Sequence, residues 1–554
     1  IFGILFANWY NNGNEVPTDK KIAKEYWGDR LKKVATFAST DEYLLMNGCD
    51  HQPVQADLGK AIEVASELYP DINFKHSNFP EYIKAIKEKV PNDLAVVKGE
   101  LTSQDTDGWS TLINCASSHI YLKQMNRKCE SALENGAEPV RVLSSVLGQN
   151  YPSDELEYSW KKLMQNHPHD SICCCSVDEV QDEMATRFNK SKQVADYLVS
   201  EGKRYIADKI NTKEYEKYKN VLPFVVFNTT GRERTSVVSV EIDVTRKSGW
   251  LKKCAYDLDE INVPNYKLID SAGNSIPFKI EDLGVRFGYD LPKDKFRQPY
   301  MARRVRVTFE AENISAVGYK TYALVEGDTE KVTDTLVSSE NCMENDAIRV
   351  EINKNGSLNV TDKASGRTYK GVAYYEETGD LGNEYMYKMP EGSKAITTQD
   401  TVAKIELAED EPYRAMYKIT NTITVPKSGD DNFEDEKSHM VFFKERVGGR
   451  SNDTVEMKIE TFVSLDKNGK GVKIKTRFDN EVKDHRVRIM VPTGINSDVH
   501  KADSVFEVVT RNNRHNAGWN NPSGCEHEQG FVSIDDGEKC IAVANKGFYE
   551  YEML

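Results

Sequence analysis

The spacing of apolar residues divides the chain into two parts with different periodicities. Up to about residue 210, short apolar runs alternate with segments in which apolar residues recur every three or four positions, the period of an amphipathic helix. From about residue 215 the period becomes two, as in Val305, Val307 and Phe309. This alternation is typical of half-buried antiparallel strands. The sequence therefore predicts a multidomain protein of the α/β + α + β class.

The first domain, residues 1–105, mixes both patterns. Apolar runs at residues 1–6, 43–46 and 94–97 predict three strands, and the amphipathic segments between them predict helices. Strands that alternate with helices favour a parallel sheet built from βαβ units. Because only three strands are predicted, we interpret this region as part of a larger α/β domain.

Residues 106–212 are predicted to form a three-helix bundle, because long amphipathic segments follow one another through short connections. The Asn135-Gly136 pair is expected to end the first helix. Asp154 and the pair Ser176 and Glu179 have the spacing of helix caps at the starts of the second and third helices.

Period-two segments predict two antiparallel β-sandwiches, a small one over residues 213–335 and a larger, incomplete one over 336–554. The polar stretch 328–344 is the expected boundary between them. Within the larger domain, residues 376–385 form an acidic, turn-rich segment. A solvated loop explains it better than a calcium site, because it lacks the standard calcium-loop spacing. Asp484-His485-Arg486 is most simply a salt-bridged sheet edge.

Charge and cysteine content narrow the class of protein. The net charge of −15 and the pI near 5.4 argue against nucleic acid and anionic membranes as partners, and no apolar run is long enough to span a bilayer. Ten cysteines, three of them consecutive, do not form a spaced disulfide framework. We therefore expect a reducing, cytoplasmic location, with a homodimer left open beside a monomer.

Residues 165–178 hold the most unusual cluster of side chains. Two imidazoles flank Pro168, Asp170 follows directly, and three thiols come next. His169 with Asp170, or His167 with His169, has the chemistry of a metal site, whereas a polar helix corner explains the same residues without a ligand. The adjacent thiols lack the spacing of structural zinc ligands, which usually lie two to four residues apart.

Two of the predicted strands are followed by residues that suit a sugar. Trp9 and Tyr10 lie among asparagines after the first strand, and aromatic faces beside amides match sugar rings and hydroxyls. Asp50, next to His51, follows the second strand. A carboxylic acid there with a raised pKa could protonate a leaving group. From the residues alone, a turn built on Asn47-Gly48 explains this segment equally well.

The run Asn166-His167-Pro168-His169-Asp170-Ser171-Ile172 resembles a motif of family 38 glycoside hydrolases, the zinc-dependent retaining α-mannosidases, in their bacterial form. The segments 46–55 and 8–13 are similar to further family segments. The resemblance implies that residues 1–105 are the C-terminal part of a parallel (β/α) catalytic barrel. It also implies these roles: His169 as a zinc ligand, Asp170, Trp9 and His51 as substrate contacts, and Asp50 as the general acid/base.

Some residues depart from the family pattern. Thr102 and His119 stand where the family has arginines, and Cys174 stands where glycine is commoner. The nucleophile and the other zinc ligands have no counterpart in the chain. Ile1, the first residue, already belongs to the apolar run predicted as a strand. We therefore expect this sequence to lack the family's N-terminal part and its extreme C-terminus, and to bind zinc poorly by itself.

The implied function is zinc-dependent hydrolysis of terminal α-linked mannose from oligosaccharides or glycoconjugates, with Zn²⁺ as cofactor and a mannoside as substrate. Two alternatives stay open. One is a hydrolase of another mannoside, such as phosphomannosyl-glycerate. The other is a carbohydrate-binding protein without catalytic activity.

Overall fold

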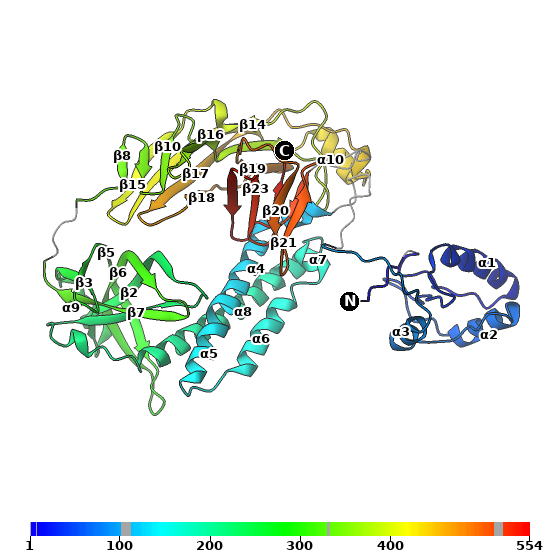
Figure 1. The fold of residues 1–554 in the computed structure, drawn as a ribbon, viewed down its shortest axis with the longest axis horizontal. Coiled ribbons are helices and arrows are strands. Elements are labelled where there is room, and N and C mark those ends of the chain that lie inside the picture. The colour runs from blue at the N-terminus through cyan, green and yellow to red at the C-terminus, as the bar shows by residue number, and fades with distance from the viewer. Residues whose placement is uncertain (1, 7, 101–111, 329–332, 515–523) are drawn as a thin grey trace. The chain divides into compact units, whose positions relative to one another are not determined.

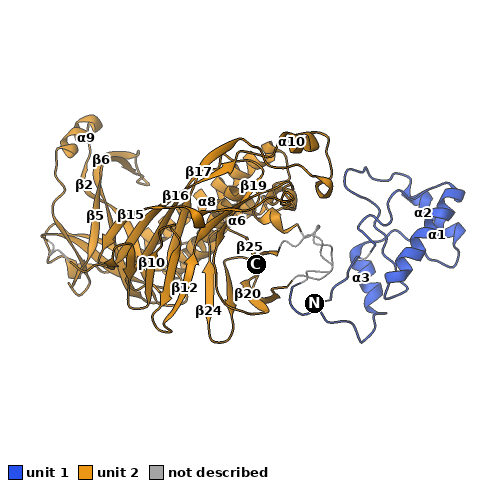
Figure 2. Cartoon of the chain, turned by 90° about the horizontal axis from the view of Figure 1, so that it is seen from above, with its two compact units in different colours: residues 1–101 blue, residues 102–554 orange. Residues whose placement is uncertain are grey.

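The computed structural model forms two compact units, residues 1–101 and residues 102–554 (Figure 2). The structure describes residues 2–6, 8–100, 112–328, 333–514 and 524–554. None of the helices in these ranges has the length and hydropathy of a membrane span.

The described residues of the first unit form the helices α1 (Lys20–Phe37), α2 (Leu58–Leu68) and α3 (Phe79–Lys87) (Figure 1). Asp19 caps α1 by accepting hydrogen bonds from the backbone N–H groups of Lys21 and Ile22. The cores of α1 and α2 pack around the buried indole of Trp27. The helices predicted from periodicity are thus confirmed.

The strands predicted at residues 1–6, 43–46 and 94–97 do not form in the described residues. Over the described part of these segments the chain is extended, but it has no strand partner. A β-strand exists only where a neighbouring strand satisfies its N–H and C=O groups, and the described residues of the first unit present none to these segments. The prediction of paired strands was therefore wrong for the described residues, and a barrel is not confirmed.

The second unit begins with a helical bundle. The long helix α8 (Asp178–Ala207) packs against α4 (Ile120–Ala132), α5 (Glu138–Val146) and α6 (Ser153–Met164) (Figure 1). Asn135-Gly136 does not end the first helix as predicted. Instead a π-helical turn, Leu133–Ala137, continues α4 into α5 and keeps the buried side chains of Leu133 and Ala137 in the core.

Two antiparallel sheets follow, in the orders β1-β7-β3-β4 and β2-β6-β5. Val307 and Phe309 of β6 share one core with Leu268 and Leu324 of the facing sheet, which is the packing of a sandwich. The alternation that predicted β6 is confirmed, since its arginines 304 and 306 point outward to carboxylates. The strands are β1 (Leu222–Asn228), β2 (Arg234–Lys247), β3 (Tyr266–Asp270), β4 (Ser275–Ile276), β5 (Phe278–Asp290), β6 (Gln298–Ile314) and β7 (Gly318–Glu326), with α9 (Leu251–Asp259) between β2 and β3.

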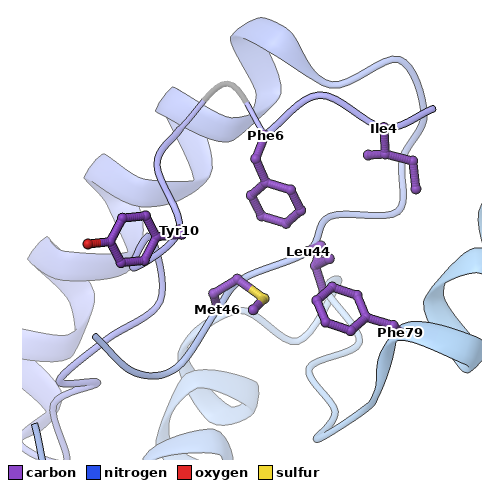
Figure 3. Close-up of a pocket in the computed structure, with 6 residues that line it drawn as sticks. All are labelled: Ile4, Phe6, Tyr10, Leu44, Met46 and Phe79. Carbon is purple, nitrogen blue, oxygen red and sulfur yellow. The ribbon is translucent and has the colours of Figure 1, made fainter. Parts of the chain in front are cut away.

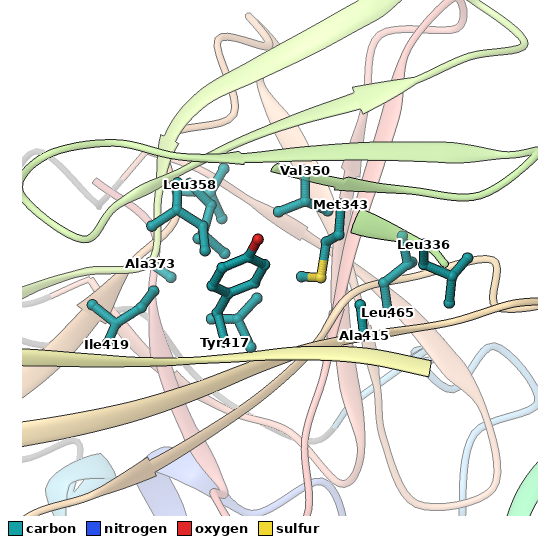
Figure 4. Packing of buried hydrophobic residues seen from close by; sticks show 12 residues of the cluster. Leu336, Met343, Val350, Leu358, Ala373, Ala415, Tyr417, Ile419 and Leu465 are labelled. Atoms are coloured by element: carbon teal, nitrogen blue, oxygen red, sulfur yellow. The ribbon is translucent and has the colours of Figure 1, made fainter. Parts of the chain in front are cut away.

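The C-terminal β region has its main core between the sheets β12-β11-β10-β9-β8 and β15-β16-β17-β18 (Figure 4). Tyr417 and Leu465 of the second sheet meet Met343 and Leu358 of the first. The first sheet contains β8 (Val337–Ser339), β9 (Cys342–Glu344), β10 (Ile348–Ile352), β11 (Leu358–Asp362) and β12 (Arg367–Val372), and the second contains β15 (Lys404–Glu411), β16 (Arg414–Pro426), β17 (Thr454–Asp466) and β18 (Lys473–Arg477). Strands β8 and β9 thus occupy the second half of the predicted boundary 328–344, which is not a plain linker; its residues 329–332 lie outside the described residues.

Three smaller sheets complete this region, in the orders β14-β13-β19, β21-β20-β23-β24 and β22-β25. The acidic segment at 376–385 was predicted as a loop, but its first part is strand β13 and the Glu377 side chain is fully buried. The strands are β13 (Tyr374–Gly379), β14 (Ile396–Thr397), β19 (His485–Met490), β20 (Val499–Asp503), β21 (Val508–Asn512), β22 (Cys525–His527), β23 (Phe531–Asp535), β24 (Cys540–Ala544) and β25 (Glu550–Glu552), and α10 is Asp431–Ser438.

Candidate functional site

In the first unit, the structure brings the predicted acid together with an aromatic pair. The Tyr10 hydroxyl donates a hydrogen bond to Asp50 Oδ2 at 3.0 Å, and this bond and the carboxylate charge raise the pKa of Tyr10. The Trp9 and Tyr10 rings stack with centroids 5.4 Å apart, and Trp9 is 65% exposed. Asp50 and His51 are also exposed. An exposed carboxylate beside open aromatic faces is chemistry that a sugar ring can use.

A buried amide holds these two loops against each other. The Asn12 side chain donates to the Leu44 carbonyl at 3.1 Å and accepts from the Met46 N–H at 2.8 Å. It thereby takes the place of a neighbouring strand for an extended segment that has none. The Gly13 N–H adds a bond to the Met46 carbonyl at 2.9 Å. Residue 13 has to be glycine for this approach, because a Cβ there would lie 2.9 Å from Leu45.

Backbone strain occurs in both loops. Trp9 has φ 71° and His51 has φ 61°, values in the left-handed region that non-glycine residues rarely adopt. Such strain persists only where the surrounding hydrogen bonds enforce it, and it concentrates at functional sites.

A hollow of about 380 Å³ lies next to Tyr10 (Figure 3). Its lining is apolar, and the Tyr10 hydroxyl points away from the other residues that line it. The hydroxyl groups of a sugar would therefore find no hydrogen-bond partners inside this hollow. The residues that line the hollow are Ile4, Phe6, Tyr10, Leu44, Met46 and Phe79.

In the second unit, the predicted helix corner between α6 and α8 is confirmed. It contains one short helix, α7 (His169–Ile172), which begins after Pro168. His169 Nε2 lies 3.4 Å from Asp170 Oδ1, and these side chains are 90% and 71% exposed. An exposed imidazole next to a carboxylate is open to a ligand.

The other imidazole of the motif has a different environment. His167 Nε2 forms a 2.8 Å hydrogen bond with Asn126 Oδ1 of α4. Burial of the ring lowers the pKa of His167, and the nearby Glu130 carboxylate opposes that shift. The two histidines therefore have separate partners, Asn126 for His167 and Asp170 for His169.

The expected helix caps at this corner are not used. Helix α8 begins at Asp178 after Val177, with no side-chain cap, and the buried Ser176 Oγ has no hydrogen-bond partner among the described residues. Likewise α6 begins at Ser153, so Asp154 lies inside the helix instead of capping it. The corner is fixed instead by Gln181 Nε2, which donates to the carbonyls of Cys174 and Ser176.

The three thiols also contribute to the shape of the corner. Cys174 adopts φ 67°, which explains why glycine suits this position, and its buried sulfur accepts a 3.2 Å hydrogen bond from Lys123 Nζ. The Cys175 thiol donates to Asp170 Oδ1 at 3.5 Å. All ten cysteines of the chain are free thiols.

Tyr385 is a residue that sequence reasoning missed. A hydrogen bond with the Cys175 thiol raises the pKa of the Tyr385 phenol, and the Asp170 charge adds to the effect. The tyrosine comes from the turn after β13, where Asn383 Oδ1 accepts bonds from the N–H groups of residues 385 and 386. No local pattern signals a contact between positions more than 200 residues apart; only the turn chemistry of Asn383 marks the loop.

The donor groups at the corner do not amount to a zinc site. Catalytic zinc takes three protein ligands, and the corner offers one imidazole and one neighbouring carboxylate. Among the residues that the structure describes, no three His, Cys, Asp or Glu side chains come together to hold a metal ion. The residues present therefore do not fit a complete zinc centre.

Comparison with known proteins gives matches over most of the chain. Residues 110–206 match the alpha mannosidase middle domain, residues 219–326 match the glycosyl hydrolases family 38 C-terminal domain 1, and residues 343–553 match the glycosyl hydrolases family 38 C-terminal domain.

Similar proteins extend this result. A Halalkalibacterium halodurans protein named "putative mannosylglycerate hydrolase" is 41% identical over the whole chain, which covers 62% of that relative. The crystal structure of an alpha-mannosidase from Enterococcus faecalis is 42% identical with a TM-score of 0.97, and that of a family 38 glycosyl hydrolase from the same organism is 38% identical with a TM-score of 0.89. The chain covers 63% of each of these two. It thus spans about three fifths of the length of its relatives.

Proposed function

Since the chain belongs to glycoside hydrolase family 38, whose middle and C-terminal domains it contains, we propose that the protein hydrolyses terminal α-linked mannosides with retention of configuration. The observation that carries the proposal is the exposed carboxylate of Asp50, which lies beside Trp9 and Tyr10. The hydrogen bonds of the Asn12 side chain hold the two loops against each other. In this role Asp50 protonates the leaving oxygen and then deprotonates the attacking water. The second carboxyl group that retention requires is not assigned to a residue of this chain.

His169 is proposed as one ligand of a zinc ion, with Asp170 as a contact to the sugar. The exposure of both side chains supports these roles, and His51 and Trp9 are proposed as further substrate contacts. The remaining ligands are not assigned. The free thiols support a reducing, cytoplasmic location for the protein.

Mannosylglycerate is a second candidate substrate. The relative named for it is 41% identical to the whole chain. This substrate also ends in α-linked mannose, so Asp50 and His169 would keep their roles and only the leaving group would differ.

The test is a comparison of hydrolysis rates for the intact gene product with an aryl α-mannoside, α-mannosylglycerate and its phosphorylated form. The proposal predicts turnover of the aryl mannoside with mannose released first as the α-anomer, which NMR detects. Faster turnover of mannosylglycerate would identify the physiological leaving group. Binding of mannose without turnover of any of the three would show a carbohydrate-binding protein instead.

Replacing His169 with alanine should remove most of the bound zinc, whereas His167→Ala should leave it near the wild-type level. The reason is that His167 Nε2 is engaged by Asn126, while the His169 imidazole is exposed. Elemental analysis of zinc per chain in the intact gene product checks this result, and each variant serves as the control for the other. Equal losses would mean that the two imidazoles share the ion.

A further inference from the structure

A second hollow of the molecule is lined mainly by positively charged side chains. It has a volume of about 280 Å³ and lies where α4, α8 and the turn after β24 meet in the second unit. Seven residues line it, and four of them carry a positive charge while none carries a carboxylate. The polar ones are Gln124, Arg127, Lys128, Ser131, Lys192 and Lys546.

The turn that contributes Lys546 packs closely against α4. The Asn545 N–H donates to the Gly530 carbonyl at 2.9 Å, and Asn545 Oδ1 accepts from the Phe548 N–H at 3.0 Å. Gly547 has φ 82°, and a Cβ at this position would lie 2.9 Å from the Gln124 Cα. The backbone on either side of Lys546 therefore packs closely against α4, and this turn forms one wall of the hollow.

The charges around the hollow are only partly neutralised. Arg127 pairs with Glu130 at 3.3 Å, and Lys192 pairs with Asp196. Lys128 and Lys546 form no ion pair within the part of the chain that the structure describes. A chain with a net charge of −15 has ample carboxylates to pair with every lysine. Lys128 and Lys546 therefore leave positive charge at this concave surface that no described carboxylate neutralises, and such charge attracts an anion.

We propose that this hollow is a binding site for a phosphoryl group, carried either by free phosphate or by a small phosphorylated sugar. The lining supplies donors of the kinds that phosphate oxygens accept: guanidinium and ammonium groups, one amide and one hydroxyl. Lys128 and Lys546, which form no ion pair among the described residues, match the double negative charge. None of the residues proposed as catalytic or as substrate contacts is among those that line the hollow.

Calorimetric titration of the intact gene product with inorganic phosphate at constant ionic strength tests the proposal. Lys128→Gln combined with Lys546→Gln should weaken phosphate binding at least about tenfold, because two charge-assisted contacts are lost. The matched control combines Lys370→Gln with Lys394→Gln, two exposed lysines outside the hollow, and should leave binding unchanged. The thermal midpoint without phosphate should be the same in all three proteins, which shows that both variants fold.

A second titration with glucose 6-phosphate identifies the source of the phosphoryl group. Binding tighter than that of phosphate points to a phosphorylated sugar, and equal binding points to phosphate itself. The proposal is overturned if neither compound binds at millimolar concentration, if chloride competes as well as phosphate does, or if the control variant weakens binding equally. Because activity is not the readout, failure of the catalytic proposal would leave this result unaffected.

Discussion

Replacing Asp50 with asparagine should lower the kcat of the intact gene product by about 10²- to 10⁴-fold on a substrate with a poor leaving group, the range expected for loss of general acid catalysis. The amide still accepts the hydrogen bond from Tyr10, so the loop geometry is kept while the proton donor is lost. Substrates whose leaving group departs without a proton, such as dinitrophenyl α-mannoside, should lose much less.

The matched control is Asp71→Asn, an exposed carboxylate of the same unit that should leave kcat at the wild-type level. Steady-state rates on both classes of substrate decide the result. If the Asp50→Asn variant hydrolyses the poor substrate as fast as the wild type does, Asp50 is not the general acid/base.

The second large effect concerns stability. Arg450→Met should destabilise the second unit by about 3–5 kcal/mol, the cost of leaving a buried charge without its partner. Glu377 is fully buried, and Arg450 donates to both of its oxygens, at 2.8 Å for Oε2. His485 Nδ1 lies 3.2 Å from Oε1. Urea unfolding measures the loss. The double variant Arg450→Met with Glu377→Leu should recover most of it, and Arg234→Met, at an exposed position, should change stability by less than about 0.5 kcal/mol.

The same pair predicts a pH dependence. Burial alone would raise the pKa of Glu377, but hydrogen bonds from His485 and Arg450 together hold it below its ordinary value. A carboxyl group with a lowered folded-state pKa stabilises the protein above its unfolded-state pKa, about 4.3, and loses that contribution as the pH falls through the folded-state value. Stability of the wild type should therefore decline below about pH 4.3, and Arg450→Met should show a weaker acid dependence. An unchanged pH profile in the variant would contradict this account.

The parts of the fold that periodicity predicted are those whose stability depends on one apolar face. Val305, Val307 and Phe309 fill the sandwich core in the predicted alternation. Met184, Phe188 and Leu198 do the same for α8. In such elements the burial of one face determines the structure, and the sequence displays that face directly.

The failures have a common physical origin in long-range hydrogen bonding. The segment 43–46 has the composition of a strand, yet the Asn12 side chain takes the place of its partner. Ser176 has the spacing of a cap, but α8 starts one residue too late to use it. Which donor meets which acceptor depends on the whole fold rather than on local spacing.

The residues of the candidate site also divide into those that local patterns predict and those that they do not. Asp50, His169 and Asp170 were found through motifs, and the structure places them at exposed positions. Their neighbours Tyr10 and Tyr385 gained their roles from contacts 40 and more than 200 residues away in sequence. Contacts of that range are determined by the tertiary fold, which no local pattern records.

The most direct test of the central claim is the rate of aryl α-mannoside hydrolysis by the intact gene product before chelation, after chelation and after zinc is added back. We predict hydrolysis that the chelator abolishes and that zinc restores, with no restoration in the His169→Ala variant. Hydrolysis that survives complete removal of the metal, or zinc-loaded protein that hydrolyses no mannoside, would contradict the account.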